Sequence, residues 1–187
     1  MTAYAARPDV ELGVEVGVEG TGRAGLLVVA WTLTNAGHEP LLVVDRVPRP
    51  SGASLAWDPR TAYVVGAGDG LVQVASRLFP LPETDRMSWA RPPRVGATEL
   101  AAGASLAREV AVPLPLVRSS PWGDDIGFGP IRLPDPVTSV QYCLGVVTGE
   151  PQPSWGLERV DGVVLLAHGG GAVVAQHVLC SDPVPLG

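Results

Sequence analysis

Apolar and polar residues alternate strictly over Val10–Glu19, where glutamates and glycines fill the positions between the aliphatic ones. Successive side chains of a β-strand point to opposite faces, so this pattern predicts a strand with one buried face and one exposed, carboxylate-bearing face. Leu26–Asn35 repeats the alternation after a glycine-containing turn at 21–25. The first 35 residues therefore predict two consecutive strands.

Similar short runs continue along the chain, each bounded by glycine, proline or asparagine. No window of helical length shows a convincing 3.6-residue period. The further predicted strands are Leu41–Val47, Thr61–Val65, Leu71–Phe79, Thr98–Leu100, Ser105–Leu116, Val137–Val147, Val163–Ala167 and Ala172–Cys180. Many short strands separated by turns predict one all-β domain over residues 1–187, an antiparallel two-sheet sandwich with long Pro/Gly-rich loops.

Turn residues predict two hairpins and one sheet edge. The glycines of 66–70 join two Val-rich runs, and the glycine triplet 169–171 is interpreted as the turn of a C-terminal hairpin. Pro113 and Pro115 cannot donate hydrogen bonds to a neighbouring strand, so we expect the end of that strand to lie at a sheet edge.

The segment from Trp31 to Val43 joins a hydrophobic strand to the next through Asn-x-Gly and a Pro-aliphatic pair. It resembles the strand-turn-strand of bacterial immunoglobulin-like domains, which include an intracellular proteinase-inhibitor type and accessory sandwich modules. Leu100–Leu106 similarly resembles their glycine-containing turn into a late strand. The resemblance implies an immunoglobulin-like sandwich and transfers no functional residue.

Composition narrows the function classes. The formal charge is −6 and every basic residue is arginine, so no basic patch predicts binding to nucleic acid. We find no signal-peptide pattern and no apolar run long enough to span a membrane, and we expect a cytoplasmic protein. Cysteines of cytosolic proteins are usually reduced, so free thiols are predicted, with a Cys143–Cys180 disulfide left open as the alternative.

The chain carries no recognised catalytic or cofactor motif. There is no nucleophile elbow, and the closest pair of soft metal ligands, His177 and Cys180, would point to opposite faces of a strand. Acidic residues in the loops, such as Asp124 and Asp125, are typical of solvated turns. We therefore expect no enzyme activity, no metal and no cofactor.

Two long loops, Pro80–Gly96 and Val117–Pro136, are the best candidates for function, because loops of this length in compact domains are commonly functional. Tryptophan and arginine are the residue types that most often anchor protein interfaces. The candidate binding residues are Arg86, Trp89, Arg91, Trp122, Asp124 and Asp125. An equally open interpretation is that each tryptophan folds back to cap the sandwich.

We therefore predict a non-enzymatic interaction or scaffold module that binds another protein through these loops. A homo-oligomer formed through exposed strand edges stays open. Two alternatives remain. One is an intracellular protease inhibitor of the immunoglobulin-like type. The other is a ligand binder or enzyme with a pocket between the sheets, which polar residues on the inward strand faces would reveal; those faces are predicted to be valine and leucine throughout.

Overall fold

The computed structural model describes residues 7–20, 25–51 and 54–186. It is an all-β structure in two sheets, and the helical segments among the described residues are short 3-10 turns, Pro153–Trp155 and Gly171–Val173. The strands are β1 (Val10–Glu19), β2 (Leu26–Asn35), β3 (Leu41–Ser51), β4 (Ser54–Asp58), β5 (Tyr63–Gly66), β6 (Leu71–Ser76), β7 (Arg94–Leu100), β8 (Ser105–Pro113), β9 (Ser139–Val147), β10 (Glu158–Val160), β11 (Val163–Ala167), β12 (Gln176–Cys180) and β13 (Val184–Pro185).

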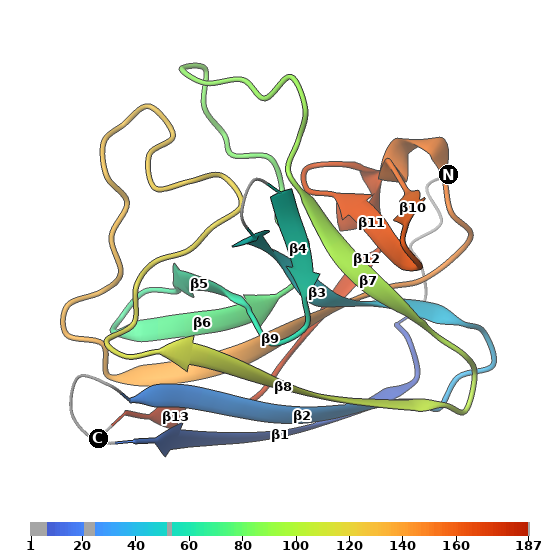
Figure 1. The fold of residues 1–187 in the computed structure, drawn as a ribbon, viewed down its shortest axis with the longest axis horizontal. Coiled ribbons are helices and arrows are strands. Elements are labelled where there is room, and N and C mark those ends of the chain that lie inside the picture. The colour runs from blue at the N-terminus through green and yellow to red at the C-terminus, as the bar shows by residue number, and fades with distance from the viewer. Residues whose placement is uncertain (1–6, 21–24, 52–53, 187) are drawn as a thin grey trace.

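The smaller sheet has three antiparallel strands in the order β1-β2-β8 and forms the lower layer in Figure 1. Its inner face follows directly from the alternation of the sequence: in β2 every second residue from Leu27 to Asn35 is buried. The outer face carries the glutamates of β1 and faces solvent. Since β8 is an outer strand of this sheet, the edge predicted at Pro113 is confirmed.

The larger sheet has ten strands and is organised around β9. Along one edge of β9, residues 139–144 pair with β6 and residues 145–147 pair with β3. The other edge of β9 pairs with β12 and β13. The β6–β9 pair is parallel, so the prediction of a wholly antiparallel sandwich is wrong at this point. Alternation within a strand fixes which face is buried but not the direction of a partner reached by a long connection.

Two hydrophobic cores lie on opposite faces of the larger sheet. The first fills the space between the two sheets. The second lies on the other face, where the long loops cover the sheet (Figure 1). Both faces of the sheet are therefore buried, which explains why Leu41–Val44 is a continuous buried run rather than an alternating one.

The Asn-x-Gly turn after β2 is held by one buried side chain. Asn35 Oδ1 accepts the backbone N–H of Gly37 at 3.1 Å. Its Nδ2 group donates to the carbonyl oxygens of Glu39 at 2.9 Å and Ala101 at 3.2 Å. The turn between β2 and β3 is thereby joined to the turn that follows β7.

The C-terminal region differs from its prediction. β11 pairs with β7 and β10, and β12 pairs with β9, so the expected hairpin around 169–171 does not form. The register of β12 on β9 places Cys143 directly opposite Cys180, and the two form a disulfide with a Cα–Cα distance of 4.2 Å. The free-thiol prediction is therefore wrong, because it rested on an assumed compartment and not on the strand pairing.

No helix in the described part of the chain has the length and apolar character needed to cross a membrane.

Candidate functional site

The two long loops lie on the same side of the larger sheet and contact each other (Figure 1). Thr84 Oγ1 donates to the carbonyl oxygen of Ile126 at 2.9 Å. The Arg86 guanidinium donates through Nη1 to the carbonyl oxygen of Gly127 at 3.0 Å. Segments far apart in the sequence therefore form one continuous surface, and the exposed residues of 80–93 and 117–136 are called the loop surface below.

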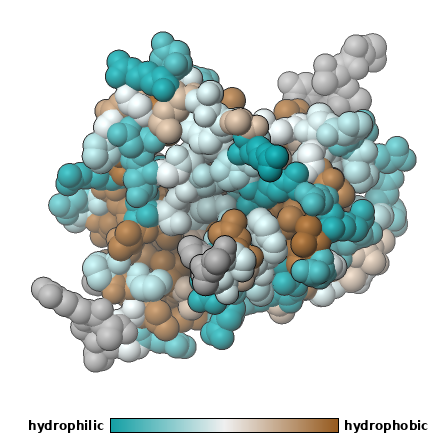
Figure 2. All heavy atoms as spheres, turned by 45° about the horizontal axis from the view of Figure 1, so that its top comes forward, coloured by the Kyte–Doolittle hydropathy of each residue, from teal (hydrophilic) through white to brown (hydrophobic). Residues whose placement is uncertain are grey.

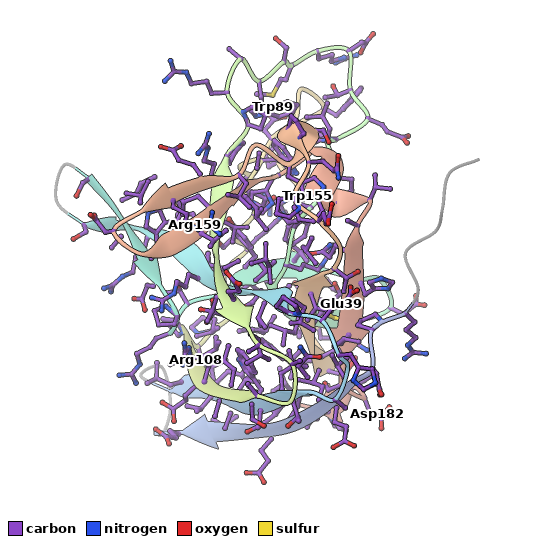
Figure 3. All side chains as sticks on the ribbon, turned by 90° about the vertical axis from the view of Figure 1, so that its right-hand side faces the viewer. Glu39, Trp89, Arg108, Trp155, Arg159 and Asp182 are labelled. Carbon is purple, nitrogen blue, oxygen red and sulfur yellow. A yellow bond between two sulfur atoms is a disulfide. The ribbon has the colours of Figure 1, made fainter. Side chains whose placement is uncertain are left out.

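The tryptophans of the two loops pack against each other and against the second core, beneath the loop surface. Trp122 is only 8% exposed and belongs to the second core. Its ring lies 5.0 Å from that of Trp89, which is half-buried, in an edge-to-face arrangement. Trp89 lies near the top of the molecule in Figure 3. The capping interpretation therefore describes Trp122 best, since little of its side chain is left for a partner to contact.

His168 lies beneath Trp122 and is completely buried. Its Nδ1 accepts the backbone N–H of Phe79 at 3.1 Å, so the ring proton sits on Nε2, which lies 3.0 Å from the Tyr63 hydroxyl. Burial, with a smaller effect from the charge of Arg77, lowers the pKa of His168 to about 3. The imidazole is therefore neutral, fully hydrogen-bonded and shielded from solvent, which fits a structural role.

Phe128 is the most exposed aromatic side chain of the loop surface, at 62%. The guanidinium carbon of Arg86 lies 4.5 Å from the centre of its ring, within the range of a cation–π contact. Gly127 has a φ of +98°, and a Cβ there would come within 2.5 Å of Arg86 Cβ. Glycine at 127 therefore allows Arg86 to lie against the loop that presents Phe128.

The two adjacent aspartates stabilise the loop rather than forming a carboxylate pair. Asp125 Oδ1 accepts the backbone N–H groups of Gly127 at 2.7 Å and Gly129 at 3.0 Å. These bonds, that of Gly127 first, lower the pKa of Asp125. Asp124 forms an ion pair with Arg118 at 2.7 Å. Of the predicted binding residues, Asp125 thus stabilises the turn around Phe128 through its bonds to the glycines on either side of that residue.

The exposed part of the loop surface is a mixture of apolar side chains and arginines. Figure 2 brings this side forward and shows apolar patches interrupting the polar surface. Arg91 is exposed on the same loop as Trp89. The exposed large apolar residues of the two loops are Leu81, Met87, Val117, Phe128 and Ile131. Sequence reasoning missed Phe128, although an aromatic residue between two loop glycines is a usable signal.

One charged cluster lies between the sheets, contrary to the prediction of wholly apolar inward faces. Asp45 of β3 has no exposed side-chain surface. Its carboxylate accepts hydrogen bonds from Thr98 Oγ1 at 2.9 Å and from Arg108 Nε at 3.1 Å. Because Arg108 belongs to β8, this ion pair joins the two sheets. Its burial indicates a structural contact, since nothing in solution can reach the carboxylate.

The cysteine and histidine side chains that could serve as soft metal ligands have structural roles. Cys180 is disulfide-bonded and His168 is buried in the second core. Within residues 7–20, 25–51 and 54–186, no three His, Cys, Asp or Glu side chains come together in a way that could hold a metal ion.

Comparison of the chain with protein-family models, with curated proteins and with solved structures found no match.

Proposed function

We propose that this chain is a non-enzymatic interaction module that binds another protein through the loop surface. The observation that carries the proposal is the exposure of Phe128 and Met87 on two loops that are hydrogen-bonded to each other over a buried aromatic base. Aromatic residues, methionine and arginine are the types enriched at protein interfaces. Ordering the loops before binding also reduces the entropy lost when a partner docks.

Arg86 and Phe128 form the centre of the proposed contact. The guanidinium covers one part of the aromatic ring, so the two side chains restrict each other before a partner arrives. A partner with an apolar side chain flanked by a carboxylate fits this pair, because the ring offers apolar area and the guanidinium offers paired N–H donors. Arg91 adds a second cation on the same loop.

We also propose that the sandwich is of immunoglobulin-like type. In that fold, strands A, B, E and D form one sheet and C, F and G form the other. The order β1-β2-β8 matches A-B-E, and the path β3-β9-β12 matches C-F-G. The chain departs from antibody domains in its disulfide, which lies within one sheet instead of joining two.

The disulfide supports an oxidising compartment as the place of action. Disulfides persist outside the reducing cytosol and are rare within it. Cys180 is exposed, so in a reducing environment its sulfur is open to attack by small thiols. We therefore propose that the module works where this bond stays formed, in place of the cytoplasmic location predicted from the sequence.

The test is affinity capture with three forms of the protein: wild type, Phe128→Asp, and Leu55→Asp as a matched control. Leu55 is 59% exposed on β4, outside the two loops. We expect one protein to be retained by wild type and the control and lost by Phe128→Asp, with urea midpoints unchanged. Equal retention by all three forms would refute the proposal. If the captured protein is a protease, inhibition by wild type but not by Phe128→Asp would identify the module as an inhibitor.

A further inference from the structure

The outer edge of β1 is open along its length. β1 pairs with β2 through ten consecutive residues, and among the described residues no backbone group pairs with its other side. Every second residue of such a strand directs its N–H and C=O groups away from its neighbour. The outer edge of β1 therefore presents unpaired backbone N–H and C=O groups to solvent.

Other outer strands of the structure are partly covered. Along β8, the N–H of Ala111 donates to the carbonyl oxygen of Arg60 at 2.9 Å. In β5, Val64 exchanges two backbone hydrogen bonds with Ser119, at 2.9 and 2.8 Å. β1 has neither kind of cover, its register with β2 contains no bulge, and it contains no proline. Cover, a bulge and proline, three of the devices that prevent strand addition, are thus missing from β1, and its remaining protection is the charge of its glutamates.

An open groove runs between this edge and the opposite sheet. Its volume is about 470 Å³, and it is lined by Val10, Leu12 and Val14 from β1, by Leu179 of β12 and by Asp182 in the segment that follows β12. Figure 3 looks at this side, where Asp182 lies near the start of β1. The three aliphatic residues are only half-buried, although they face the first core. A strand added to β1 would cover them with its own inward side chains.

The disulfide fixes the far wall of this groove. Cys180 lines the groove and is bonded to Cys143 in the central strand β9. The short strand β12 is therefore covalently held at the position that faces β1.

The outward face of β1 specifies the charge of the added strand. Glu11, Glu15 and Glu19 share this face, and their direct partners on β2 are Thr34, Ala30 and Leu26. The neighbouring strand thus supplies no cation directly opposite these carboxylates. A second copy of this chain pairing through β1 would bring its own glutamates to the same face, and like charges on adjacent strands destabilise pairing.

We propose that β1 is a strand-addition site for an extended segment of a partner protein in which aliphatic residues alternate with lysine or arginine. The aliphatic side chains enter the groove, the basic side chains lie opposite the glutamates, and the backbone completes the ladder of β1. This site is separate from the loop surface and does not depend on it.

The probe is a short fluorescent peptide that alternates valine and lysine, compared with a valine–glutamate peptide and with a valine–lysine peptide interrupted by a central proline. Anisotropy titrations of the oxidised protein should show saturable binding of the valine–lysine peptide alone. The E11K/E15K variant should bind that peptide about tenfold more weakly, which corresponds to about 0.7 kcal/mol for each of two cross-strand pairs. It should also gain binding of the valine–glutamate peptide.

The matched control is E39K/E150K, which makes the same charge change at two exposed glutamates outside β1 and outside the loop surface and should leave binding unchanged. Hydrogen exchange should show amides of β1 becoming protected when the valine–lysine peptide is bound. The proposal is overturned if the proline-interrupted peptide binds equally well, if E11K/E15K has no effect, or if β1 gains no protection. It is also overturned if light scattering shows a dimer that E11K/E15K dissociates, since a second copy then occupies the edge.

Discussion

Removing the guanidinium of Arg108 tests whether its ion pair with Asp45 holds the two sheets together. The substitution Arg108→Met keeps the length of the aliphatic stem and deletes the charge. The buried carboxylate then keeps the hydrogen bond from the Thr98 hydroxyl and the longer ion-pair contact with Arg46, whose Nε lies 3.9 Å away. A carboxylate without exposed surface cannot exchange the lost partner for water.

The expected loss of stability follows from the burial of the pair. Removing one partner of a buried ion pair costs about 3–5 kcal/mol. Because Arg108 is 27% exposed and Asp45 retains Thr98, we expect a loss below that range, about 2–3 kcal/mol near neutral pH. With a urea dependence of about 2 kcal/mol per molar, the unfolding midpoint should fall by about 1–1.5 M.

The pH dependence gives an independent check. Burial raises the pKa of Asp45, and Thr98 and Arg108 oppose that rise. A carboxyl whose pKa is raised by folding favours the folded state in acid, and this contribution is lost as pH rises through the folded-state pKa. Loss of Arg108 raises the pKa of Asp45 further, so the variant should lose the most unfolding free energy near neutral pH. Its stability difference from wild type should shrink at about pH 4, the ordinary pKa of an aspartate, because a carboxyl with a raised pKa already carries its proton there.

The assay is urea unfolding of the oxidised protein, followed by tryptophan fluorescence at both pH values. The Asp45→Asn/Arg108→Met double variant removes both charges and should recover most of the loss. A loss below about 0.5 kcal/mol, which is typical of an ordinary surface substitution, would refute the reasoning. An equal loss at both pH values would refute it as well, because it would show that the carboxylate charge is not involved.

Three further predictions concern the disulfide and the second core. Replacing both Cys143 and Cys180 by serine should cost about 4 kcal/mol from the chain entropy of the closed loop, and mass spectrometry of the denatured, unreduced wild type should find no free thiol. His168 has a pKa lowered to about 3, so wild-type stability should fall as pH drops from about 6.5, and His168→Gln should flatten that slope in urea unfolding. Trp122→Ala should cost about 3–5 kcal/mol in the same assay, and a loss below about 1 kcal/mol would show that Trp122 is not a core residue.

Strands with one exposed face could be predicted closely from the sequence. β1 and β2 begin and end where the alternation does, because a half-buried strand must place an apolar residue at every second position. The prediction was poorer where both faces are buried or where pairing is distant. β7 extends from Arg94 instead of Thr98, and β12 pairs with β9 instead of forming a hairpin with β11. Local patterns contain no information on which distant strand supplies the hydrogen bonds.

The candidate site could be predicted only in part for the same reason. The two loops were identified by length and composition, and the structure joins them through Thr84 and Arg86. Trp122 was predicted as either a contact or a cap, and only its distance from His168 and the second core decides between them. The disulfide and the Asp45–Arg108 pair depend on strand register and sheet packing, which no local spacing shows.

The pairing of β9 with four other strands has a consequence for how the chain is made. Residues 139–147 are synthesised after β3 and β6. The edges of β3 and β6 that pair with β9 therefore stay unpaired until these residues leave the ribosome. The larger sheet therefore cannot close until about three quarters of the chain has been synthesised, and until then the nascent protein exposes strands that favour aggregation. A chaperone that holds the growing chain until β9 arrives would improve its yield, and fragments ending before Ser139 should be insoluble when expressed alone.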